Sequence, residues 1–200
     1  MHSITKSFDF CYGHRVWSQT LDPALSCNAP CKCRHLHGHQ GKVTVKLMTH
    51  KLKDGMVTDF HHLAWFKEFL DDYLDHKMIF DENDPFLPNF LMGYSVWPDQ
   101  TNTLSPWATA YFEPLPIHGS NLDTYTLKYF PQHSLDLNKT PLEKEILEGM
   151  VLVNFIPTSE NIAAFLYTVI EVRMNGKFSG WIKSVEFNET PKTSAVFEAP

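Results

Sequence analysis

The sequence lacks any uninterrupted apolar run long enough to span a bilayer. Its first residues, M-H-S-I-T-K-S-F-D-F, also lack the apolar stretch of a secretory signal peptide. Hydrophobic residues make up 43% of the chain and charged residues 20%, an ordinary balance for a globular protein. We therefore expect a cytoplasmic protein with no membrane partner, whose 200 residues suffice for one sizeable core.

An excess of basic residues is also missing. The chain has 17 lysines and arginines against 23 aspartates and glutamates, which gives a formal net charge of -6. Domains that bind nucleic acid usually carry a basic stripe, so no nucleic-acid partner is expected. An anionic small molecule is not excluded, because a few local basic residues suffice to bind one.

Cysteine is scarce, with four residues in the whole chain. Three of them, Cys27, Cys31 and Cys33, are close together, which is more typical of metal or catalytic chemistry than of a disulfide framework. We expect the fourth, Cys11, to be a small apolar residue packed in the first strand.

The stretch C-N-A-P-C-K-C-R-H-L-H-G-H ends in two histidines that flank a glycine. In an extended strand, His37 and His39 face the same side and can reach one point in space. A catalytic zinc usually keeps three protein ligands and an open position. His14 is the candidate for the third ligand, although a closed structural site of two cysteines and two histidines is an alternative at this point.

Hydrophobic periodicity predicts an α+β fold with an antiparallel sheet and two helices packed on one face. Alternating or apolar strand patterns occur at residues 3–10, 41–48, 150–155, 182–189 and 195–197. Helical spacing follows Asp59, which has the character of an N-cap, and follows the P-T-S-E-N segment, where Thr158 or Ser159 is the expected cap.

Residues 85–149 differ in composition from the rest, because prolines alternate there with aromatic residues. The aromatic content argues against disorder, and the prolines argue against long regular elements. We expect a folded, irregular insertion with one strand near 124–130 and a short helix near 141–148. The organisation is then a single domain over residues 1–200 that carries this insertion.

Separated motifs occur in one order along the chain: F-x-F-x-x-x-H-R, C-x-x-x-H-G-H, T-D-F, L-D-H-K, P-T-S-E-N and F-N-E-T. Together they make the chain resemble the 6-pyruvoyl-tetrahydropterin synthase family. Within it, the 6-carboxy-tetrahydropterin synthases of the queuosine and 7-deazapurine pathway are most similar. The resemblance covers roughly residues 1–84 and 150–200, and each motif alone is weak.

The resemblance implies a zinc-dependent lyase acting on 7,8-dihydroneopterin triphosphate. His14, His37 and His39 would hold the zinc ion, which would meet the hydroxyl groups of the substrate side chain. Coordination lowers the pKa of a hydroxyl and polarises the adjoining carbon, so that a proton can leave carbon near neutral pH.

The resemblance also implies roles for residues around the zinc. Cys33 would be the base on one face of the substrate, and Asp75 would orient His76 on the other face. Glu189 would bind the amino and ring nitrogens of the pterin. Further residues would frame the same ring: Thr158, Ser159 and Glu160.

The spacing of the cysteines leaves two reaction products possible. Cys33 has the spacing C-x3-H-G-H of the carboxy-producing branch, and Cys31 has the spacing C-x5-H-G-H of the pyruvoyl-producing branch. We favour Cys33, and hence 6-carboxy-tetrahydropterin with release of acetaldehyde and triphosphate. The alternatives are triphosphate elimination by a 6-pyruvoyl-tetrahydropterin synthase and a non-catalytic module stabilised by zinc.

The resemblance further implies an oligomer. Family members form trimers whose sheets join into a barrel, and two trimers pair into a hexamer with active sites between subunits. A short sheet of the predicted kind leaves open edges, which such an assembly would cover.

Overall fold

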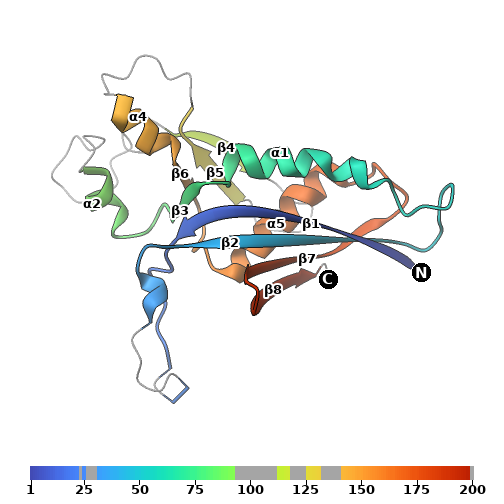
Figure 1. The fold of residues 1–200 in the computed structure, drawn as a ribbon, viewed down its shortest axis with the longest axis horizontal. Coiled ribbons are helices and arrows are strands. Elements are labelled where there is room, and N and C mark those ends of the chain that lie inside the picture. The colour runs from blue at the N-terminus through green and yellow to red at the C-terminus, as the bar shows by residue number, and fades with distance from the viewer. Residues whose placement is uncertain (23, 26–30, 93–111, 118–124, 132–140, 199–200) are drawn as a thin grey trace.

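The computed structural model describes residues 1–22, 24–25, 31–92, 112–117, 125–131 and 141–198. In this part of the chain one sheet runs in the order β4-β5-β6-β3-β1-β2-β7-β8 (Figure 1). Its strands are β1 (His2–His14), β2 (His37–Thr49), β3 (Lys77–Asp81), β4 (Glu113–Ile117), β5 (Tyr125–Tyr129), β6 (Met150–Val153), β7 (Trp181–Thr190) and β8 (Thr193–Glu198). The helices are α1 (Ala64–Tyr73), α2 (Leu87–Met92), α4 (Pro141–Glu148) and α5 (Ser159–Met174), with short 3-10 turns η1 (Lys32–Arg34) and η2 (Phe60–Leu63).

The sheet has two halves that meet at β1. Strands β1, β2, β7 and β8 pair antiparallel, and the β1–β2 pairing runs without a break from His2 opposite Thr49 to His14 opposite His37. The second half joins the first through β3, which pairs only with the last three residues of β1, from Tyr12 to His14. Most of the outer edge of β1 therefore has no strand partner within the described part of the chain.

The expectation of a purely antiparallel sheet is wrong. Strand β3 runs parallel to both β1 and β6. Parallel neighbours need a crossover connection, and α1 returns the chain so that β3 follows the direction of β1. The sequence signal is the continuous apolar run M-V-L-V of β6, all of it buried, which is typical of strands covered on both faces.

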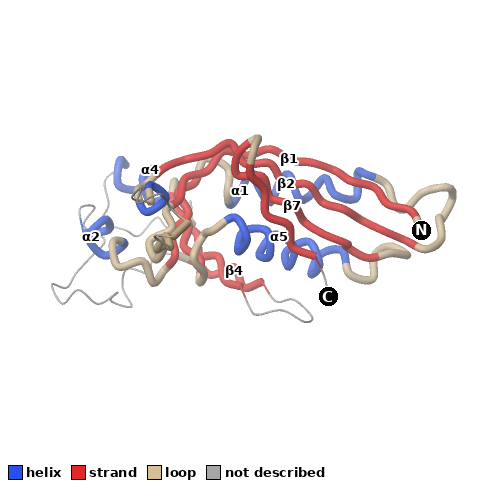
Figure 2. Tube along the Cα trace, turned by 90° about the horizontal axis from the view of Figure 1, so that it is seen from below, coloured by secondary structure: helices blue, strands red, loops and turns tan. Residues whose placement is uncertain are grey.

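Two helices cover one face of the long strands, as expected. Figures 1 and 2 show α1 and α5 packed along β1, β2 and β7. The inward side chains of β1 belong to this core, and Phe8 contacts Phe66 of α1 edge to face, with ring centroids 5.1 Å apart. Helices α2 and α4 cover the opposite face of β3 and β6, in a second hydrophobic cluster around Phe80 and Leu152.

The expected helix caps are confirmed. Asp59 accepts a hydrogen bond from the main chain of His61 at 2.7 Å and caps η2, which leads into α1. Thr158 accepts from the main-chain N–H three residues later and caps α5. The tight turn after β2 places Asp54 and Gly55 at φ values of 52° and 80°, the left-handed region that glycine tolerates best.

The insertion is partly described. Its expected strand and helix are confirmed as β5 and α4, while β4 and α2 were not expected. Tyr125 of β5 packs on Phe165 of α5 at 5.9 Å between ring centroids, which attaches the β4–β5 hairpin to the main core. Residues 93–111, 118–124 and 132–140 of the insertion lie outside the described residues, as does Cys27. No helix among the described residues is long and apolar enough to cross a membrane.

Candidate functional site

Three histidine side chains meet at one end of the β1–β2 pair. His14 lies directly opposite His37, and Tyr12 lies opposite His39. Residues two apart along a strand face the same side, so all three imidazoles share one face of the sheet. The ring centroids are 4.6 Å apart for His14 and His37, 4.9 Å for His37 and His39, and 5.2 Å for His14 and His39. The structure thus brings together the three residues expected as metal ligands.

Hydrogen bonds on the outer side of two rings determine which nitrogen faces the cluster. His14 Nδ1 lies 2.6 Å from the carbonyl oxygen of Pro157, and His37 Nδ1 lies 2.8 Å from that of His35. A carbonyl oxygen only accepts, so each Nδ1 donates and carries a proton. In the neutral rings Nε2 keeps its lone pair, and metal-ligating histidines in proteins are oriented in the same way.

Glu189, near the end of β7, completes this cluster. Its Oε1 lies 3.2 Å from His14 Nε2 and 3.4 Å from His39 Nε2. Both nitrogens are buried without a hydrogen-bond partner among the described residues. A carboxylate oxygen and an unprotonated Nε2 are both acceptors, so this contact needs a cation between them, either a proton or a metal ion.

The pKa shifts in the cluster fit a neutral His39 beside an ionised Glu189. Burial lowers the pKa of His39, so this ring resists protonation even though the charge of Glu189 acts in the opposite direction. The close contact with His14 is the main cause that lowers the pKa of Glu189, which favours an ionised carboxylate. The ligand atoms of His14, His37, His39 and Glu189 all lie within 4.8 Å of one another. This donor set fits a zinc ion, and it includes no cysteine, unlike the structural site considered above.

Cys33 lies in η1, on the loop that connects β1 to β2. Its carbonyl accepts from the main-chain N–H of Val16 at 2.8 Å, which ties the loop to the end of β1. Burial raises the pKa of the Cys33 thiol, and the hydrogen bond with Cys31 and the charge of Glu189 raise it further. The charge of Glu189, a member of the histidine cluster, therefore acts on the Cys33 thiol. The thiol of Cys31 instead donates to Gln19 Oε1 at 2.8 Å.

The P-T-S-E-N segment adjoins the histidine cluster where α5 begins. Pro157 supplies the carbonyl that holds His14, and Thr158 follows as the helix cap. Ser159 is half-buried and Glu160 is exposed in the first turn. The segment expected to frame a pterin ring is thus next to the cluster, with Glu160 directed toward solvent.

A second cluster lies at the turn between α1 and β3. Asp75 Oδ2 is 3.0 Å from His76 Nδ1, and Asp75 Oδ1 accepts from the main-chain N–H of Cys11 at 2.6 Å. The main-chain N–H of His76 donates in turn to the carbonyl of Cys11 at 2.6 Å. Burial raises the pKa of Asp75, but the hydrogen bonds from Cys11 and His76 outweigh it and lower the pKa overall.

The two clusters lie on opposite faces of β1. Cys11 and His14 are an odd number of residues apart, so their side chains point away from each other. The structure therefore does not join Asp75 and His76 to the three histidines within one chain. The expectation that Cys11 is a packed apolar residue is also wrong, because its side chain is exposed. The alternation of Phe8 and Phe10 was the signal that places Cys11 outward.

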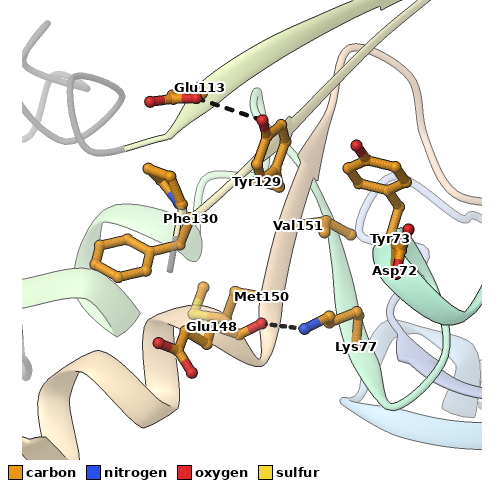
Figure 3. A pocket seen from close by; sticks show the side chains of 10 residues that line it. Asp72, Tyr73, Lys77, Glu113, Tyr129, Phe130, Glu148, Met150 and Val151 are labelled. Atoms are coloured by element: carbon orange, nitrogen blue, oxygen red, sulfur yellow. Dashed lines mark hydrogen bonds between the residues drawn. The ribbon is translucent and has the colours of Figure 1, made fainter. Parts of the chain in front are cut away.

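A cavity of about 360 Å³ flanks the turn that carries this second cluster (Figure 3). Asp72 and Tyr73 line it before the Asp75–His76 pair, and Lys77 lines it after the pair. Figure 3 shows the amine of Lys77 directed at the main-chain oxygen of Glu148, 2.5 Å away. Lys77 and Tyr129 use their polar groups within the fold, and none of the lining residues belongs to the histidine cluster.

The chain matches a known protein family over nearly its whole length. The family model described as 6-pyruvoyl tetrahydropterin synthase matches residues 3–200. The chain belongs to this family. The match extends over the insertion, which the motifs alone did not reach.

Relatives of this family have been named and solved. The 6-carboxy-5,6,7,8-tetrahydropterin synthase of Aquifex aeolicus is 37% identical over 91 residues, which are 42% of this chain and 56% of that protein. A putative enzyme of the same name from Pyrococcus abyssi is 37% identical over 68 residues, 33% of this chain and 41% of that protein. The matches thus span about half the length of these curated relatives.

Solved structures share the fold. The crystal structure of an uncharacterized protein from Wolinella succinogenes is 39% identical, with a TM-score of 0.82, covering 100% of this chain and 98% of that one. The 6-pyruvoyl tetrahydropterin synthase of Caenorhabditis elegans is 18% identical with a TM-score of 0.50, covering 100% and 96%. The second similarity supports the fold alone.

Residues that support the histidine cluster were missed from the sequence. The ring of Tyr12 contacts His14 and His39, with centroids 5.1 and 5.7 Å apart. Arg15, which follows His14, forms a buried ion pair with Asp84 beyond β3, with Nε and Oδ2 3.0 Å apart. This pair ties the strand end that carries His14 to the other half of the sheet. Neither partner is marked by local spacing, because the contact depends on the parallel β1–β3 pairing.

Proposed function

We propose that the chain is a zinc-dependent lyase that converts 7,8-dihydroneopterin triphosphate to 6-carboxy-5,6,7,8-tetrahydropterin, acetaldehyde and triphosphate. The observation that carries this proposal is the histidine cluster, in which the lone pairs of His14 and His39 face the carboxylate of Glu189 and need a cation. The names of the two curated relatives support the same reaction. Atom balance requires one water molecule on the substrate side.

His14, His37 and His39 would hold the metal ion through Nε2. Zinc bound there supplies a Lewis acid that lowers the pKa of a substrate hydroxyl and polarises the adjoining carbon. The hydrogen bonds from Nδ1 of His14 and His37 to main-chain carbonyls keep the rings in the tautomer and orientation that this role needs.

Cys33 is the proposed base for removal of a proton from carbon. Its pKa is raised where no cation offsets burial and the charge of Glu189, so the thiol needs a nearby positive charge to act as a thiolate. The zinc site would provide that charge. Glu189, relieved of its contact with two lone pairs, would accept from adjacent N–H groups of the pterin, framed by Thr158, Ser159 and Glu160.

Asp75 and His76 would move protons on the other face of the substrate. Because they lie on the opposite face of β1 from the three histidines, one chain does not form a complete site. We therefore propose that Asp75 and His76 of one copy meet the histidine cluster of another, in a trimer or hexamer whose contacts cover the open edge of β1. Each chain would be a single domain over residues 1–200, carrying the insertion at 85–149.

The carboxy product is favoured over the pyruvoyl product by the relatives' names and by the placement of the cysteines. Cys31 donates its thiol hydrogen to Gln19, whereas Cys33 is within electrostatic reach of Glu189. A non-catalytic zinc module is disfavoured, because a structural site has no use for the separate Asp75–His76 pair. A cytoplasmic role in making queuosine or another 7-deazapurine belongs to this proposal.

Mass spectrometry of products formed from 7,8-dihydroneopterin triphosphate tests the proposal. We expect 6-carboxy-tetrahydropterin and acetaldehyde from the zinc-loaded protein. A product that retains the three-carbon side chain would move the assignment to the pyruvoyl reaction. No turnover of the substrate by the metal-loaded oligomer would overturn the enzyme assignment.

A further inference from the structure

Three side chains of the second cluster have the composition of a metal site. The ligand atoms of Cys11, Asp75 and His76 all lie within 4.8 Å of one another. Sulfur, imidazole nitrogen and carboxylate oxygen are the three ligand types that zinc takes in proteins. A thiolate and a carboxylate together balance the charge of a divalent cation. The set therefore selects a borderline-soft ion such as zinc over magnesium or calcium, which prefer oxygen alone.

The backbone holds these side chains in place before any ion arrives. The main chain of Cys11 is bound on both sides, since its N–H donates to Asp75 Oδ1 and its carbonyl accepts from the N–H of His76, each at 2.6 Å. Strand β1 is in turn fixed by its full pairing with β2. Binding an ion at this position costs little ordering of the chain, which is the condition for a built site.

The cluster is also accessible. The side chain of His76 is 79% exposed, and Cys11 is exposed beside it. Lys67, whose charge helps to lower the pKa of Asp75, is held by a salt bridge to Asp71. In the single chain an ion can thus enter from solvent, with water in the fourth position, whereas the histidine cluster is buried.

We propose that Cys11, Asp75 and His76 form a second, weaker zinc site whose occupation inhibits the enzyme. The Cys11 thiol gives up its proton to solvent on binding, and the sulfur, an imidazole nitrogen of His76 and a carboxylate oxygen of Asp75 bind the ion. No oxidation or reduction takes place. The inhibitory part rests on the proposed function, because the ion ties up the carboxylate and imidazole assigned to proton transfer.

Metal stoichiometry tests the site without reference to activity. Chelator-stripped protein is dialysed against rising zinc concentrations, and bound zinc is measured by mass spectrometry. We expect two zinc-binding steps in the native protein. In Cys11→Ala the affinity of the weaker step should fall about tenfold or more, so that this step is lost from the titration range. Cys31→Ala is the matched control and should keep both steps. His37→Ala should lose the tight step and keep the weak one.

Cobalt gives an independent signal at the same site. A cobalt–thiolate charge-transfer band should appear with the second equivalent of Co²⁺, disappear in Cys11→Ala and persist in Cys31→Ala. Because Cys11 is exposed, its replacement should leave the unfolding temperature unchanged, which verifies that the variant is folded. Equal zinc binding by Cys11→Ala and the native protein, or a single binding step in the native protein, would overturn the proposal.

Inhibition by the second zinc ion is tested by measuring the turnover rate of the native protein and of Cys11→Ala at rising zinc concentrations. The native protein should lose activity as the second step fills, and Cys11→Ala should have the same basal rate but need about tenfold more zinc for the same inhibition. Inhibition that is identical in both proteins would refute the regulatory role. A protein without turnover at any zinc concentration would instead refute the proposed function, while the binding steps still decide the second site.

Discussion

The two clusters on β1 differ in burial although they are only three positions apart along one strand. His14 is 1% exposed, while the side chain of His76 is 79% exposed. In the buried cluster, Nδ1 of His14 and His37 binds a carbonyl, while Nε2 of His14 and His39 has no hydrogen-bond partner in the described part of the chain. This arrangement suits a permanently held cation. The exposed cluster has a histidine oriented by an aspartate and open to water, which suits rapid proton exchange.

This contrast shows how one strand can serve two chemistries. Alternation of side chains along the strand places one set of ligands against the core, where burial disfavours protonation of histidine. The other set faces solvent, where the side chains can exchange protons with water. A cation and a proton carrier on the same face would compete for each other's ligands. Separate faces avoid that competition within one chain, and assembly of chains would bring the two functions to one substrate.

The largest expected effect is loss of the metal ion from the buried cluster, which would remove the difference between the two clusters. We expect His37→Ala to reduce retained zinc from about one per chain to almost none after dialysis, and to abolish turnover. The control is His35→Ala, because the side chain of His35 is exposed and only its carbonyl contacts His37. Full zinc occupancy in His37→Ala would remove this residue from the metal site.

Removing the thiol should separate metal binding from catalysis. Cys33→Ala is expected to lower turnover by about 10²–10⁴-fold, the range for a general base, while zinc stays bound. Cys31→Ala should retain most activity. If the two variants behaved the other way round, Cys31 would be the base and the product assignment would move to the pyruvoyl reaction.

The buried cluster was predictable from the sequence because its ligands follow local rules. An H-x-H pair on a strand must share a face, and the F-x-F alternation places His14 on the core side of β1. The strand order beyond β1 was not predictable in this way. The parallel β1–β3 contact joins residues far apart in sequence, and the Asp75–His76 turn is positioned by that contact rather than by its own sequence.

Two further errors had a physical cause in the same region. Cys11 was expected inside because cysteine is usually buried, yet the strand period places it outside. The antiparallel sheet was expected because helices and strands do not alternate regularly, yet α1 acts as the crossover that makes β3 parallel. Glu189 alternates with Glu186 and Asn188 and so shares the core face with Val185 and Phe187, but its contact with two histidines depends on the pairing of β2 with β7.

The exposed cluster is tested by changing only the group that orients its histidine. We expect Asp75→Asn to lower turnover about 10²-fold with the buried zinc retained, since the asparagine amide faces His76 Nδ1 with a donor in place of an acceptor. Asp71→Asn is the control, because Asp71 forms only an exposed pair with Lys67 one helical turn away. Loss of zinc in Asp75→Asn would contradict the separation of the two clusters.

Replacement of Glu189, whose carboxylate contacts His14 and His39, should have a smaller effect. Glu189→Gln keeps the shape but loses charge, so binding of a pterin such as sepiapterin or neopterin should weaken by about 1.5–3 kcal/mol in a calorimetric titration. Zinc content should hardly change if the three histidines suffice as ligands. Glu186→Gln on the same strand is the control and should bind the pterin normally. Unchanged affinity in Glu189→Gln would eliminate Glu189 as the pterin contact.

The smallest effect concerns the phenol beneath the buried cluster. Tyr12 is 4% exposed, and its hydroxyl has no hydrogen-bond partner among the described residues. Burial, followed by the charge of Glu189, raises its pKa, so the group stays neutral. An unpaired buried hydroxyl costs about 1–3 kcal/mol. Tyr12→Phe should therefore raise the unfolding temperature of the metal-free protein by a few degrees, at about 2–4 °C per kcal/mol for a chain of this size.

Tyr167→Phe is the matched control for this measurement. Tyr167 is similarly buried, but its hydroxyl donates to the carbonyl of Ile182 at 3.3 Å, so removing the hydroxyl should lower the unfolding temperature. The two substitutions are chemically identical and should shift stability in opposite directions. A loss of stability in Tyr12→Phe would show that its hydroxyl has a partner.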